Sequence, residues 1–132
     1  SGFTKTVYYL NGIILQRDAS QQANNGELVD TKDGWQNLQA GDLLFFGRKA
    51  DENRKERITH VAIYIGDGDF IHAAGRVRIN SFNPEKPYYS DYRKSGFIRA
   101  KRILTSVGKK GIERILENNF YKWSLSFKEL LV

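Results

Sequence analysis

The sequence predicts an α+β domain in which an N-terminal helix precedes an antiparallel meander of strands. Apolar residues at the start of the chain recur at helical spacing, and the later apolar runs are short and bounded by turn residues. No internal repeat and no linker divides the 132 residues, so one domain with one core is expected.

Residues 2–10 are expected to form the first helix. Three apolar side chains would share one of its faces at helical spacing, namely Phe3, Val7 and Leu10. The Asn11-Gly12 pair would end this helix, because both residue types are common just after a helix.

A second and much shorter helix is expected after the apolar run of residues 13–15. Asp18 or Ser20 could be its N-cap, since both side chains carry an oxygen that accepts backbone N–H groups. The segment 24–26, Asn-Asn-Gly, would stop it. Residues 27–39 are polar and irregular, and no strand is expected there.

The meander is expected between residues 43 and 104. Strands are predicted at 43–46, 60–65, 70–73, 77–79 and 97–104. Gly47 would end the first strand, and the highly charged segment 48–57 would be a loop. Residues 83–91 contain both prolines and two tyrosines, so a loop is expected there as well.

The last part of the chain is expected to be a helical extension, residues 105–132, outside a domain of residues 1–104. An apolar stripe at Ile112, Ile115 and Leu116 predicts an amphipathic helix over 108–119. The state of 120–132 is ambiguous. Its large apolar side chains are expected to pack on the sheet, although they could form an exposed patch for a partner: Trp123, Phe127, Leu130 and Leu131.

The composition excludes several classes of protein. With 40% hydrophobic and 27% charged residues and only two prolines, the chain is not of the disordered type. No apolar run approaches the length of a membrane span, and the absence of cysteine excludes disulfides and thiolate metal sites within the chain. The chain has neither a methionine nor a secretory signal, so we expect it to be a piece of a longer protein.

The chain is basic, with a net charge of +6 and a pI of about 9.6. Such a charge favours attraction to a polyanion, for example nucleic acid or an anionic cell envelope, but an ordinary basic surface would look the same. The basic residues are scattered, and nothing matches an aromatic RNA-binding platform or a zinc finger. No nucleic-acid partner is therefore expected.

The only two histidines, His60 and His72, stand at the outer ends of an expected hairpin whose turn is 66–69. Histidine carries protons near neutral pH, so the pair suggests a catalytic base positioned by a second ring. An odd-length loop or a bulge would place both on one face of the hairpin. Two structural histidines are the alternative. A two-histidine metal site is another, but it lacks a third ligand at suitable spacing.

Five segments resemble the NlpC-type bacterial cell-wall cysteine peptidases, in the order of that family: Ser1-Gly2-Phe3, Arg17-Asp18-Ala19-Ser20-Gln21-Gln22, the run from Leu38 to Phe46, the run from His60 to Gly66, and Phe70-Ile71-His72-Ala73. The first is similar to the end of the nucleophile motif Asp-Cys-Ser-Gly-Phe. The third is similar to L-x-P-G-D-L-v-F-F, with Ala40 where proline is usual. The resemblance covers residues 1 to about 104 and implies a papain-like fold, in which an N-terminal helix packs on an antiparallel sheet.

The resemblance also implies a catalytic arrangement of a thiolate, a base and a group that orients the base. His60 would be the general base and acid, and His72 would accept a hydrogen bond from its ring. The nucleophilic cysteine would be the residue immediately before Ser1, where a helix N-terminus lowers the pKa of a thiol. The chain as written would then be inactive alone. A truncated or processed chain, or a modified cysteine omitted from the sequence, is expected rather than a natural absence.

One branch of the family places the equivalent of Asp18 in the substrate pocket, where it pairs with the free α-amine of an N-terminal L-alanine; the alternative role of Asp18 is a helix cap. Ser1 would line the same pocket. The implied substrates are peptidoglycan peptides of the form L-Ala-γ-D-Glu-diamino acid, cleaved after the γ-D-glutamyl group. An upstream SH3-like domain, a periplasmic or cell-envelope location, and the absence of any cofactor or metal are expected with them.

Two other functions remain open at this point. The chain could be a catalytically inactive module that binds cell-wall peptides through the same groove. Alternatively, it could be a basic nucleic-acid binder, a hypothesis that depends only on the net charge of +6.

Overall fold

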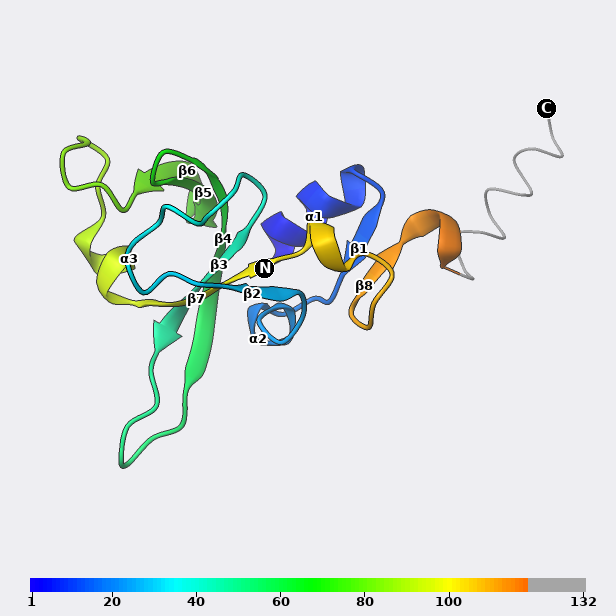
Figure 1. Ribbon diagram of the computed structural model, residues 1–132, viewed down its shortest axis with the longest axis horizontal. Coiled ribbons are helices and arrows are strands. Elements are labelled where there is room, and N and C mark those ends of the chain that lie inside the picture. The colour runs from blue at the N-terminus through cyan, green and yellow to red at the C-terminus, as the bar shows by residue number, and fades with distance from the viewer. Residues whose placement is uncertain (119–132) are drawn as a thin grey trace, which may run out of the picture.

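A six-stranded antiparallel sheet lies at the centre of the fold (Figure 1). The computed structural model describes residues 1–118. The helices are α1 (Gly2–Leu10), α2 (Ala19–Gln22) and α3 (Asp91–Ser95), with single 3₁₀ turns η1 (Leu104–Ser106) and η2 (Ile115–Glu117). The strands are β1 (Ile13–Leu15), β2 (Glu27–Val29), β3 (Leu43–Arg48), β4 (Arg57–Gly66), β5 (Asp69–Ala74), β6 (Arg76–Ser81), β7 (Phe97–Arg102) and β8 (Ile112–Arg114). The predicted α+β class is confirmed.

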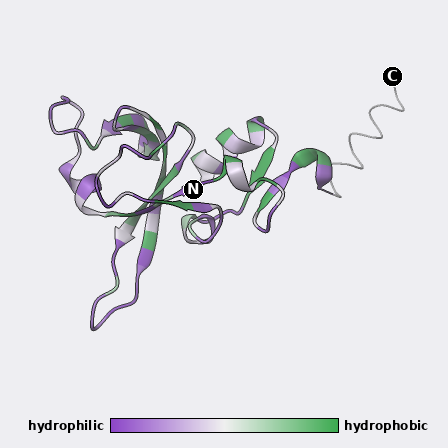
Figure 2. Cartoon of the chain, in the orientation of Figure 1, coloured by the Kyte–Doolittle hydropathy of each residue, from purple (hydrophilic) through white to green (hydrophobic). Residues whose placement is uncertain are grey.

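The large sheet has the strand order β2-β7-β3-β4-β5-β6, and β1 and β8 form a separate two-stranded sheet. Strands β3 and β4 bury side chains on both faces. Leu43, Phe45 and Val61 pack with α1 and β1, whereas Phe46 and Phe70 belong to a second apolar cluster on the opposite face. The tip of the β3–β4 hairpin is mostly hydrophilic and projects away from this core (Figure 2).

Both predicted N-terminal helices form. Helix α1 spans the predicted residues 2–10, but its expected apolar face is only partly buried: Phe3 and Val7 pack against the core, whereas Leu10 is 77% exposed. Asp18 is the N-cap of α2, and in its capping box the Asp18 backbone N–H donates to the side chain of Gln21 at 3.1 Å. Ser20 lies within the helix. Of the two cap candidates, the structure therefore selects Asp18.

Several boundaries at the central sheet differ from the prediction. Strand β4 begins at Arg57, inside the segment expected to be a loop, and β5 and β6 both extend beyond the predicted residues. Residues 27–29 form an edge strand that pairs with β7, although only Val29 of the three is buried, which explains why no apolar pattern signalled it. Gly47 does not end β3, because a bulge between Phe46 and Gly47 lets the strand continue to Arg48. A Cβ at Gly47 would lie 1.9 Å from the carbonyl oxygen of Arg57, so the bulge requires glycine.

Helix α3 was not predicted, because its first residue falls in the stretch 83–91 that was expected to be a loop. Ser90 could have indicated the start of this helix, since its hydroxyl accepts the backbone N–H of Arg93 at 3.2 Å and so caps the helix. Strand β7 also ends at Arg102, before the predicted residue 104.

The helix predicted over 108–119 is wrong for the described residues. Residues 112–114 form β8, which pairs with β1 and places Ile112 across from Leu15. Ile112 is fully buried, but Leu116 is 70% exposed, so the three apolar residues do not share a buried face. The segment 119–132, with the four large apolar side chains named above, lies outside the described residues, and the domain boundary at residue 104 stays a prediction. In the described part of the chain, no helix has the length and apolar character needed to cross a membrane.

Candidate active site

The two histidines meet on one face of the sheet. His60 Nε2 and His72 Nδ1 are 2.8 Å apart. Ile63 of β4 pairs with Ile71 of β5, so position 62 of β4 lies opposite His72. Side chains two residues apart in a strand share a face, so His60 lies on the same face as position 62. The register shifts between Tyr64 and Gly66. Of the two arrangements considered from the sequence, an odd-length loop or a bulge, the structure has the bulge, and it places both rings on one face.

The environment of this pair favours neutral rings. Burial is the largest of the effects that lower the pKa of His60 to about 3, and the charges of Arg93 and His72 contribute in the same direction. His72 is 1% exposed, and burial also lowers its pKa. Phe46 packs against His60 with ring centroids 5.9 Å apart. A neutral His60 can accept a proton, which is the property that a general base requires.

Asn80 of β6 is a third member of the array that the sequence did not predict. Its Oδ1 lies 2.7 Å from His72 Nε2, and its amide nitrogen donates to the Tyr88 carbonyl at 3.0 Å. Because the Asn80 amide nitrogen is turned to the Tyr88 carbonyl, the Asn80 Oδ1 faces His72 and accepts a hydrogen bond there. His72 must therefore carry its proton on Nε2. The alternation of side chains along β6 could have indicated Asn80, because it puts Asn80 on the same face as Arg78, the residue opposite His72.

This array assigns the proton positions in both rings. Because His72 Nε2–H donates to Asn80, His72 Nδ1 is the acceptor for the Nε2–H of His60. His60 then presents Nδ1 as a free acceptor, and no hydrogen bond to that nitrogen occurs within residues 1–118. The arrangement can remove a proton from a group placed beside Nδ1.

We expect the Asn80→Ala substitution to disturb this assignment without unfolding the protein. His72 Nε2–H would lose its acceptor, so both tautomers of His72 should become populated, and any catalysis through His60 should fall by roughly tenfold or more. The ¹⁵N chemical shifts of the His72 ring measure the tautomer directly. Asn53→Ala, at the exposed hairpin tip, is the matched control. A single unchanged tautomer of His72 in Asn80→Ala would contradict the role of Asn80.

Ser1 and Asp18 lie close to the histidine pair. Ser1 is the N-cap of α1 and lies near both His60 and Asp18. Gln22 of α2 connects the two helices, because its amide nitrogen lies 3.4 Å from the Ser1 carbonyl and its Oε1 accepts the Thr4 hydroxyl at 3.0 Å. The N-terminus of α1 is therefore held beside α2, whose N-cap is Asp18.

The described residues do not assemble a metal site. Among residues 1–118, no three side chains of histidine, cysteine, aspartate or glutamate come together as ligands. The groups gathered around His60 are instead suited to proton transfer and to the binding of charged substrate groups.

Residues 1–99 match the sequence profile described as the NlpC/P60 family. A gamma-D-glutamyl-L-lysine dipeptidyl-peptidase from Bacillus cereus is 47% identical over 73 residues, which cover 55% of this chain and 20% of that protein. The protein of the same name from Bacillus subtilis is 41% identical over 73 residues, covering 55% of this chain and 22% of that protein. The matches thus span about a fifth of the length of these relatives.

Solved structures of NlpC/P60 family proteins are similar to this chain as well. An NlpC/P60 family protein from Bacillus cereus superimposes with a TM-score of 0.59 at 38% identity, over 76% of this chain and 30% of that chain. An NLP/P60 family protein from Staphylococcus aureus also has a TM-score of 0.59, at 30% identity, over 77% of this chain and 30% of that chain.

Proposed function

The chain belongs to the NlpC/P60 family, and from this premise we propose that it is the catalytic part of a cysteine peptidase acting on peptidoglycan-derived peptides. The observation that carries the proposal is the hydrogen-bonded array of His60, His72 and Asn80 beside the N-terminus of α1. The scissile bond is the one between γ-D-glutamate and a diamino acid. The names of the Bacillus relatives support this substrate class.

The nucleophile of this reaction is the thiol of a cysteine at the position before Ser1, since the 132 residues contain no cysteine. The N-terminus of α1 stabilises its thiolate, and His60 takes up the thiol proton at Nδ1. The thiolate attacks the γ-carbonyl of D-glutamate, and His60 then protonates the leaving amine of the diamino acid. Water hydrolyses the thioester with His60 again as the base.

Asp18 and Ser1 form the part of the site that binds the other end of the substrate. The carboxylate of Asp18 is exposed at the N-terminus of α2, near Ser1, so it can pair with the free amine of an N-terminal L-alanine. An SH3-like domain of the same protein completes this pocket, and the protein works in the cell envelope. Similarity to murein endopeptidases of Escherichia coli supports that location.

The first experiment incubates the natural protein that carries this chain with L-Ala-γ-D-Glu-L-Lys and follows the products by mass spectrometry. Release of L-Ala-γ-D-Glu and free lysine supports the peptidase. Binding of the intact peptide without cleavage would instead favour the inactive peptide-binding module. Salt-dependent DNA binding without an effect of the peptide would favour the nucleic-acid binder.

Replacing Asp18 by asparagine should remove the preference for a free N-terminal amine. Asparagine keeps the helix cap but loses the negative charge, so kcat/KM for the free peptide should fall by roughly 10- to 100-fold. The rate for the N-acetylated peptide should change little. Steady-state kinetics with both peptides measure the effect, with Asp33→Asn as the exposed control. Equal losses for the two peptides would exclude amine recognition by Asp18.

A further inference from the structure

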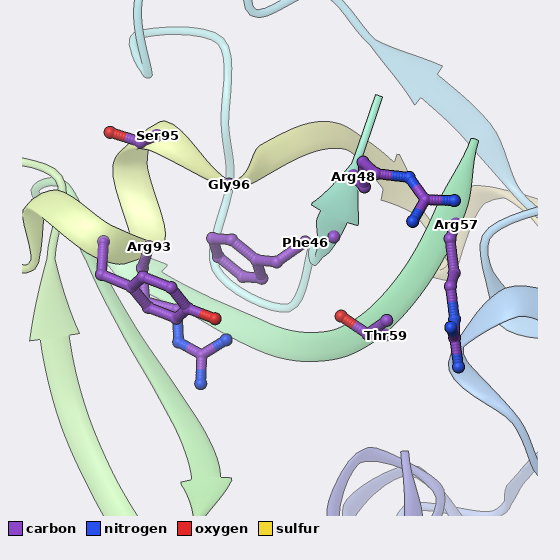
Figure 3. A pocket seen from close by; sticks show the side chains of 9 residues that line it. Phe46, Arg48, Arg57, Thr59, Arg93, Ser95 and Gly96 are labelled. Atoms are coloured by element: carbon purple, nitrogen blue, oxygen red, sulfur yellow. The ribbon is translucent and has the colours of Figure 1, made fainter. Parts of the chain in front are cut away.

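A cleft of about 440 Å³ lies between the base of the β3–β4 hairpin and helix α3. Arg48 and Arg57 enter it from the two hairpin strands, and Arg93 enters it from α3 (Figure 3). Phe46 lies between these two sides, and Thr59 faces the cleft from β4. Three arginines thus surround one opening next to the proposed active site.

These arginines lack acidic partners. Within residues 1–118, no carboxylate forms an ion pair with Arg48, Arg57 or Arg93. The Nε of Arg48 is buried without a hydrogen-bond partner, and its other contact is a donation to the Lys55 carbonyl at 3.2 Å. A buried donor without an acceptor is costly, so a ligand that accepts hydrogen bonds would be stabilised here.

The nearest carboxylates of the hairpin are already engaged elsewhere. Asp51 accepts the backbone N–H groups of Asn53 and Arg54 and closes the hairpin tip. Glu56 forms a two-point ion pair with Arg99. Arg78 adds a further positive charge near Arg93 rather than a counter-charge. Arg48 acts on Asp51, so the positive charges of Arg57 and Arg93 are the ones left for an external anion.

The cleft lies directly beside the histidine pair. Phe46 is the cross-strand partner of His60, and the Arg93 guanidinium is 5.8 Å from the centroid of the Phe46 ring. The charge of Arg93 also acts on His60. Helix α2, whose N-cap is Asp18, packs through Ala19 on the opposite face of the sheet, in the cluster that contains Val61. Asp18 and Arg93 therefore belong to elements on opposite faces of the sheet, and Phe46 connects Arg93 with His60.

We propose that this cleft binds the carboxylate of the substrate residue that leaves, on the opposite side of the scissile bond from Asp18. This inference depends on the proposed function, which places the substrate amine at Asp18. Arginine forks bind carboxylates through two parallel hydrogen bonds, so Arg57 and Arg93 would hold the leaving diamino acid by its carboxylate. The preferred substrates are then peptides that end in a free carboxylate just beyond the scissile bond.

The test compares L-Ala-γ-D-Glu-L-Lys with its C-terminal amide as substrates of the natural protein that carries this chain. Because the amide cannot make the charge-assisted hydrogen bonds of the carboxylate, kcat/KM should favour the free acid by roughly 10- to 100-fold. The double variant Arg57→Gln, Arg93→Gln should lose most of this preference by losing rate on the acid. Arg54→Gln, an exposed arginine at the hairpin tip, should keep it. Circular dichroism establishes that each variant is folded.

Each outcome bears on the proposal. Equal rates for acid and amide in the unchanged protein, or a preference that survives both substitutions, would overturn it. If neither peptide is cleaved, the proposed function has failed, and equilibrium binding of both peptides to the 132-residue chain then tests the cleft separately. Tighter binding of the acid that needs Arg57 and Arg93 supports the cleft; equal binding overturns it.

Discussion

The His60→Ala substitution is expected to lower kcat/KM for γ-glutamyl peptide cleavage by roughly 10³-fold or more. His60 is the group whose Nδ1 is free to exchange protons, while its Nε2 is held 2.8 Å from His72. Without the imidazole, the thiol must ionise unaided and the leaving amine loses its acid. Both steps of the proposed reaction are therefore slowed.

Steady-state kinetics of the natural protein that carries this chain measure this loss. The substitution should leave the fold intact, because His60 is only half-buried at the edge of the core, and thermal unfolding provides the check. Asn53→Ala, on the exposed loop of the same hairpin, should keep the full rate. A folded His60→Ala protein that cleaves at nearly the normal rate would exclude His60 as the base.

The largest effect on stability is expected from replacing Asp42, the residue just before β3. Its carboxylate is almost completely buried and accepts the backbone N–H of Gln39 at 2.8 Å. It also accepts two hydrogen bonds from Arg102, both at 2.9 Å. Asp42→Ala leaves the Gln39 N–H without an acceptor and Arg102 without its counter-charge. We expect the free energy of unfolding to fall by about 3 kcal/mol. This is the lower end of the range for breaking a buried ion pair, because Arg102 keeps some contact with water.

Urea denaturation of the 132-residue chain measures this change. Asp51→Ala is the matched control, since Asp51 pairs with Arg54 at the surface, where such an ion pair contributes about 1 kcal/mol or less. If both substitutions lower the free energy of unfolding by the same amount, burial does not distinguish the two carboxylates, and the structural role of Asp42 is wrong.

Local patterns predicted the elements near the site well. Helix α1 forms where the apolar spacing placed it, and Asp18 caps α2 as its side chain allows. The hairpin of β4 and β5 follows from two apolar runs around a Gly-Asp-Gly-Asp turn. Each of these features depends on interactions within a few residues, and a sequence window contains them completely.

The same kind of pattern failed where the partner is distant. Ile112, Ile115 and Leu116 have helical spacing, but Ile112 instead pairs with Leu15 from near the start of the chain. Val29 likewise joins the sheet through β7, which lies far along the sequence. Backbone pairing with a remote strand decides these segments, and it leaves little trace in local polarity.

The sequence by itself determined the fold class, the family resemblance and the two histidines, because motifs and periodicities lie within short segments. Tertiary structure alone decided the bulge that turns both rings to one face, the contact of Asn80 with His72, and the gathering of three arginines at one cleft. The first two features require atoms of different strands to approach within about 3 Å, and strand register, not composition, sets that distance. The third requires α3 to pack beside the β3–β4 hairpin, which is far from it in the sequence.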